Sequence, residues 1–93
     1  MIMREQNNTT KKHMAKLIKA YGDNVKDVDI STLKDMQNIV GGYIEIVHIS
    51  AEEMLIVNEE GLLFGLPFNS EASELAGITI LGDAILTTRK EMK

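Results

Sequence analysis

The sequence predicts an α+β domain: a small, mostly antiparallel sheet of about five to six strands with two short helices packed on it. Three observations lead to this prediction. The chain has 93 residues, the size of one domain, and 44% of them are hydrophobic, which is enough for a core. Two segments combine helical spacing with helix caps, and several others are rich in β-branched residues. We expect residues 1–13 to form a flexible basic tail and residues 14–93 to form the single domain.

The first helix is predicted over residues 32–40. Thr32 and Asp35 have the spacing of a capping box, in which each side chain accepts a hydrogen bond from the backbone of the other residue. Gly41 suits the left-handed position at which a helix ends. The apolar side chains of this segment share one face: Leu33, Met36, Ile39 and Val40.

The second predicted helix is shorter and follows Pro67, which ends the preceding segment because it has no N–H for a strand ladder. Asn69 or Ser70 suits the N-cap of this helix, and Gly77 suits its end. We therefore expect a helix that runs through Ala76.

The strands are predicted from β-branched and alternating segments at residues 43–49, 54–57, 62–66 and 78–88. Gly82-Asp83 interrupts the last segment and indicates a bulge or a tight turn. Asn58 begins and Gly61 ends the connection between the second and third segments, as is typical of a hairpin turn. We therefore expect these two segments to pair as a β-hairpin.

Residues 14–30 fit two interpretations. An amphipathic helix that stops at Gly22 is indicated by the helical spacing of four side chains, Met14, Leu17, Ile18 and Tyr21. In the alternative, residues 15–21 and 25–30 are two strands, joined by a Gly-Asp-Asn turn. The pattern alone slightly favours the helix.

The charges divide the chain into an acidic body and two basic ends. Residues 21–86 carry twelve carboxylates and two lysines, a formal charge of −10, whereas residues 1–20 carry +4 and residues 87–93 carry +2. An acidic body repels nucleic acid, so we expect no direct nucleic-acid binding. It attracts basic protein surfaces instead. The simpler interpretation is that an acidic surface keeps the protein soluble.

Several kinds of site are excluded by composition. The chain has no cysteine, which excludes disulfides, cysteine-ligated metals and thiol catalysis. No apolar run approaches the roughly 18 residues of a membrane span, and no export leader is visible, so we expect a cytoplasmic protein with no membrane partner. His13 and His48 have no second ligand at a metal-site spacing. We expect no metal, no cofactor and no catalytic residue.

Three strings carry a resemblance to a known family: VGGYIE at residues 40–45, VNEEG at 57–61 and GLPFN at 65–69. With the helix before them and ILGDA after them, residues 29–84 resemble a family of small phage, prophage and plasmid proteins, the domain-of-unknown-function family 3846. The resemblance implies that residues 15–30 form the hairpin. The family has no established activity and usually begins at this hairpin, so the thirteen residues before it are a departure.

Small phage proteins often oppose host defences, so the resemblance implies a counter-defence role. We expect a non-catalytic accessory protein of a phage or mobile element, an anti-CRISPR-like inhibitor that docks an acidic surface on a basic host protein. Glu59 and Glu60 are paired carboxylates, but at a hairpin tip they are solvated, which argues against acid–base catalysis. The candidate contact residues are Asn58, Glu59, Glu60, Gly61, Glu52 and Glu53.

The alternative is a protein that sequesters a small nucleotide signal between subunits. An anionic ligand needs cations and, for its base, a stacking or hydrogen-bonding side chain, so the candidates are Lys11, Lys12, Lys16, Lys19, Phe68, Asn69 and Arg89. A small enzyme is the weaker alternative. A homodimer is also expected, because the core is small and either a sheet edge or residues 62–64 can pair across a two-fold axis.

Overall fold

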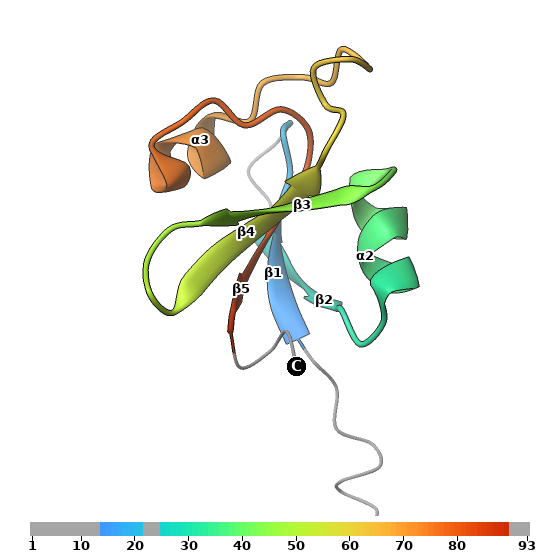
Figure 1. The fold of residues 1–93 in the computed structure, drawn as a ribbon, viewed down its shortest axis with the longest axis vertical. Coiled ribbons are helices and arrows are strands. Elements are labelled where there is room, and N and C mark those ends of the chain that lie inside the picture. Colours follow the sequence, from blue (N-terminus) through green and yellow to red (C-terminus); the bar gives the residue numbers. More distant parts are fainter. Residues whose placement is uncertain (1–13, 22–24, 90–93) are drawn as a thin grey trace, which may run out of the picture.

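An antiparallel sheet forms the centre of the structure, with a helix on each side (Figure 1). The computed structural model describes residues 14–21 and 25–89, and within these ranges the sheet has five strands in the order β2-β1-β5-β4-β3. The strands β2 and β3 are therefore its two edges. The elements are β1 (Met14–Ile18), β2 (Val25–Asp29), α2 (Leu33–Val40), β3 (Ile44–His48), β4 (Glu53–Asn58), α3 (Ser70–Ala76) and β5 (Ala84–Thr88). The α+β prediction is confirmed.

The strands β1 and β2 pair antiparallel, with Met14 opposite Asp29 and Ile18 opposite Val25. The helix suggested by the spacing of residues 14–21 is therefore wrong, and the hairpin implied by the family resemblance is correct. The predicted turn at residues 22–24 lies outside the described residues, as do residues 1–13.

The caps of both helices are those predicted. The Asp35 N–H donates to Thr32 Oγ1 at 3.0 Å, and the Thr32 N–H donates to Asp35 Oδ2 at 3.1 Å, which completes the capping box. Gly41 ends α2 at φ +85°, a left-handed conformation that glycine adopts without strain. Asn69 is the N-cap of α3. Neither described helix is long and apolar enough to cross a membrane.

The predicted hairpin between residues 54–57 and 62–66 is wrong. The strand β4 instead pairs with β3, across a turn that starts at Ile49, and with β5 on its other side. Both edges of β4 are therefore occupied, and no edge is left for residues 62–66. Residues 62–65 form successive turns instead. The last predicted strand is shortened as well, because residues 78–83 contribute only an isolated bridge between Leu81 and Phe68.

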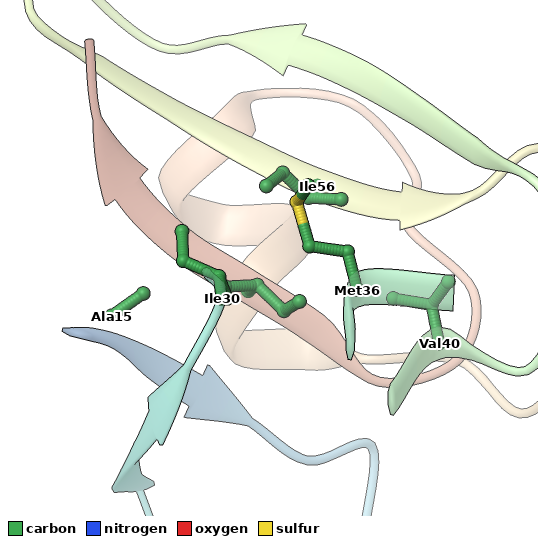
Figure 2. Close-up of a cluster of buried hydrophobic side chains, with 6 residues drawn as sticks. Ala15, Ile30, Met36, Val40 and Ile56 are labelled. Atoms are coloured by element: carbon green, nitrogen blue, oxygen red, sulfur yellow. The ribbon is translucent and has the colours of Figure 1, made fainter. Parts of the chain in front are cut away.

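The core is divided by the sheet into two layers. Between the sheet and α2 lie six buried side chains (Figure 2): Ala15, Ile30, Met36, Val40, Ile56 and Ile85. On the opposite face, beneath α3, lie Ile18, Leu55, Val57, Ala72, Ile80 and Ala84. Because both faces are covered, the inner strand β4 is buried at every residue from Met54 to Asn58, which explains its uninterrupted apolar run.

Candidate functional site

A loop of consecutive turns, residues 59–65, projects from the end of β4 and is called here the apolar loop. Backbone hydrogen bonds hold its shape: the Phe64 N–H donates to Glu60 O at 3.0 Å, and the Leu66 N–H donates to Gly61 O at 2.9 Å. The base of the loop is close-packed, since a Cβ at Gly61 would lie 3.2 Å from the carbonyl oxygen of Leu81. The loop is therefore a structured projection.

The apolar loop presents three consecutive large hydrophobic side chains to solvent. Leu62 is 84% exposed, Leu63 75% and Phe64 54%, and Tyr43 before β3 is 65% exposed. Phe64 and Tyr43 line the same open hollow of about 500 Å³, with Glu60, Gln37, Asn38, Gly41 and Gly42. Soluble proteins rarely expose contiguous apolar surface, and where they do, it commonly marks an interaction site.

Carboxylates surround this apolar surface. Glu60 lines the same hollow as Tyr43 and Phe64. Glu59 and Glu45 line a second hollow of about 280 Å³, together with Leu62 and Ile78. The surface therefore has an apolar centre with an acidic rim.

Asn58 fixes the start of the apolar loop from inside the protein. Its side chain is buried, with Nδ2 donating to Val40 O at 3.0 Å and Oδ1 accepting from the Glu60 N–H at 2.7 Å. Gly61 is buried too. Of the four residues from 58 to 61 predicted to contact a partner, Glu59 is exposed and Glu60 is half-buried, whereas Asn58 and Gly61 are buried and position them.

Glu52 and Glu53 lie at the opposite end of β4 from Glu59 and Glu60. The strand has six residues, so about 20 Å separates the two acidic pairs. Both glutamates are exposed, and their N–H groups donate to Ser50 Oγ in the turn between β3 and β4. The predicted acidic contact residues thus form two separate groups.

The structure does not gather the described cations into one site. Lys16 Nζ is 2.9 Å from Asp27 Oδ1, an ion pair between β1 and β2. Lys19 follows β1 and Arg89 follows the antiparallel β5, so about 17 Å of strand separates them. Lys11 and Lys12 lie outside the described residues.

Asn69, predicted as a ligand-binding residue, is 1% exposed and uses its amide inside the protein. Its Nδ2 donates to Ile18 O and to Gly82 O, both at 2.9 Å, and its Oδ1 accepts from the Ala72 N–H at 3.0 Å. Both amide hydrogens therefore have acceptors already. Phe68, the candidate for base stacking, is exposed.

The histidines and carboxylates of the described residues form no cluster of three that suits a metal ion. His48 lies at the exposed end of β3, beside a hollow of about 260 Å³ with Ile46, Met54 and Arg89. His13 lies outside the described residues.

Tyr43 and Leu62 to Phe64 are absent from the predicted contact residues for a partner protein, although the sequence indicated residues 62–64 as a segment for pairing between subunits. The signal was present, because three consecutive large hydrophobic residues after a Gly do not alternate as a half-buried strand does. They were assigned to a strand because the turn before them resembled a hairpin turn. Their exposure, and the position of Leu62 to Phe64 side by side in one loop, make them contact candidates.

The chain matches a protein-family model over a range that contains both the sheet and the apolar loop. The family model described as Domain of unknown function (DUF3846) matches residues 14–93, a range that includes every described residue. Neither a curated protein nor a solved structure matches the chain.

Proposed function

The chain belongs to the DUF3846 family, and from this premise we propose that it acts by binding another protein and catalyses no reaction. The observation that carries the proposal is the apolar loop, whose Leu62, Leu63 and Phe64 are exposed although the loop is fixed by hydrogen bonds. A preorganised loop loses little conformational entropy on binding, so most of the gain from burying these side chains is kept.

The chemistry of the surface describes its partner. Tyr43 and Phe64 flank a hollow, and aromatic side chains beside a pocket are typical of the residues that dominate binding energy. Glu45, Glu59 and Glu60 line the two hollows beside these apolar side chains. A matching partner has an apolar cleft with lysine and arginine at its rim, because opposite charges speed association and select the partner.

The family resemblance suggests where to look for that partner. It implies a phage or mobile-element origin, so a basic protein of a host defence system is the first candidate, and the protein would act as its inhibitor. A second candidate function, the sequestering of a nucleotide signal, has weaker support because the described cations are dispersed over the fold.

The test is a pull-down with a pair of matched variants. Phe64 and Phe68 are exposed to nearly the same extent, 54% and 56%, but only Phe64 belongs to the apolar loop. We expect Phe64→Ala to weaken binding by about 30-fold, the effect of losing a central aromatic contact, and Phe68→Ala to leave it unchanged. Mass spectrometry identifies the proteins that the wild type and Phe68→Ala retain, and calorimetry then measures the affinities.

The acidic rim is tested separately with the identified partner. Glu59→Gln and Glu60→Gln are expected to slow association and to weaken its dependence on salt, because rim charges act mainly on the encounter. A partner that binds Phe64→Ala as tightly as the wild type would refute the assignment of the apolar loop. An association rate that does not change with ionic strength would refute the proposed role of the acidic rim in binding.

A further inference from the structure

The outer edge of β3 carries backbone groups that no described strand pairs with, because β3 is the last strand of the sheet. The Glu59 N–H donates to Tyr43 O at 2.8 Å, and the Ile49 N–H donates to Glu53 O at 2.9 Å. In an antiparallel ladder the bonded residues alternate, so the odd-numbered residues of β3 face β4. Ile44, Ile46 and His48 therefore direct their N–H and C=O groups away from the sheet.

The two edge strands of the sheet differ in how well they are protected against pairing with another strand. Three of the five residues of β2 are charged, Lys26, Asp27 and Asp29, and such charges discourage another strand from pairing there. The strand β3 has one carboxylate, Glu45, and its Ile46 is 40% exposed. The open edge is thus the apolar one.

We propose that β3 pairs antiparallel with β3 of a second copy of this chain, about a two-fold axis at Ile46. This register places Ile46 opposite the same residue of the second copy and Ile44 opposite His48. All three outward-facing residues then become bonded pairs, which gives about six new hydrogen bonds. The two sheets join into one.

The charges select this register over its neighbour. With the axis at Ile46, each Glu45 lies opposite Val47 of the other copy. A shift that moves the axis to Glu45 places two carboxylates opposite each other, which is unfavourable, and it also shortens the overlap. The pairing centred on Ile46 is therefore self-complementary along all five residues of β3.

Apolar side chains beside β3 add to the interface. Leu62 is 84% exposed and Ile78 55%, and both line the hollow that contains Glu45 and Val47 of β3. The second copy's strand runs along this side of the edge, so part of this apolar surface is removed from water on pairing. This proposal does not depend on the proposed binding function.

The first test measures mass in solution by sedimentation equilibrium. We expect the wild type to sediment at twice its monomer mass of 10.4 kDa. Ile46→Lys places two ammonium groups at the axis, so we expect at least a hundredfold weaker dimer. Val25→Lys is the matched control, because Val25 is 44% exposed and lies on the protected edge strand β2, and it should keep the wild-type affinity.

The second test probes the register. Ile46→Lys and Ile46→Glu should each be monomeric alone and should form a mixed dimer when combined, because residue 46 faces residue 46. A wild type that stays monomeric at millimolar concentration overturns the proposal, as does a dimer that survives Ile46→Lys. Folded variants that fail to combine overturn the register.

A third measurement uses the unmodified chain. In hydrogen exchange, the N–H groups of Ile44, Ile46 and His48 should become more protected as concentration rises. Those of Glu45 and Val47 already face β4 and serve as the internal control. A dimer in which the three outward groups exchange as fast as in the monomer overturns the proposal.

Discussion

Asn69 joins three parts of the fold, and replacing it tests that role. Its Nδ2 bonds to the carbonyls of Ile18 and Gly82, and its Oδ1 caps α3 through the Ala72 N–H. Asn69→Ala removes all three bonds and leaves backbone groups without partners at a site that is 1% exposed.

The size of the effect follows from the three bonds. Loss of an N-cap costs about 1 kcal/mol. Each of the two buried carbonyls loses a hydrogen bond worth about 1 kcal/mol. We therefore expect Asn69→Ala to lower the free energy of unfolding by about 3 kcal/mol, a large part of the roughly 5–15 kcal/mol of a typical domain. For a chain of this size, Tm falls by about 12–24 °C.

Urea unfolding followed by circular dichroism measures the change. Asn69→Ser keeps an oxygen for the cap and loses both Nδ2 bonds, so it should cost about 2 kcal/mol. Asn38→Ala is the control, because Asn38 is exposed on α2, and it should change stability by less than about 0.5 kcal/mol. A loss below about 1 kcal/mol for Asn69→Ala would refute the structural role and return this residue to the ligand-binding candidates.

Two further substitutions test buried features. Thr87 is 4% exposed, and its Oγ1 has no hydrogen-bond partner among the described residues. Thr87→Val should therefore raise the free energy of unfolding, measured by urea titration, by about 1 kcal/mol. A lower free energy of unfolding in the variant would show that the hydroxyl is bonded. Gly82 has φ +87° and a Cβ there would lie 2.8 Å from Leu66 Cδ1, so Gly82→Ala should cost about 2 kcal/mol in thermal unfolding. The control Gly77→Ala, at φ +74° with nothing within 4 Å of the added Cβ, should cost about half as much, and equal losses would exclude the clash.

Features that depend on neighbouring residues in the sequence were predicted correctly. The capping box of Thr32 and Asp35 and the cap at Asn69 are examples, because each involves residues three apart. The helical spacing of residues 14–21 misled for a different reason. Leu17 and Ile18 are buried against opposite faces of a sheet that is covered on both sides, so a strand reproduced the spacing of a helix.

The candidate site was predicted less well because it depends on pairing between distant segments. Asn58 to Gly61 has the composition of a hairpin turn, and only the occupation of both edges of β4 prevents a hairpin there. That occupation depends on the pairing of β4 with β5, which lies about 30 residues later in the chain. The composition of residues 58–61 does not show whether both edges of β4 are already paired. The exposure of Leu62 to Phe64 therefore could not be predicted from it.

The apolar loop and the paired edge of β3 can both be used in one assembly. The mixed dimer of Ile46→Lys and Ile46→Glu tests whether the two loops of such a dimer act together. Tyr43 and the apolar loop lie at the start of β3. An antiparallel pair centred on Ile46 therefore places the two loops about 20 Å apart along the strands. Leu62 is then shared with the dimer interface, whereas the hollow of Tyr43 and Phe64 is lined by no residue of β3 and stays accessible. Such a dimer is bivalent and should bind a densely immobilised partner more tightly than a monomer does. Combining Ile46→Lys with Ile46→Glu allows Phe64→Ala to be placed in one copy only. The mixed dimer should then lose the gain from bivalency and bind with the affinity of one loop, whereas unchanged binding would show that the second loop never engages.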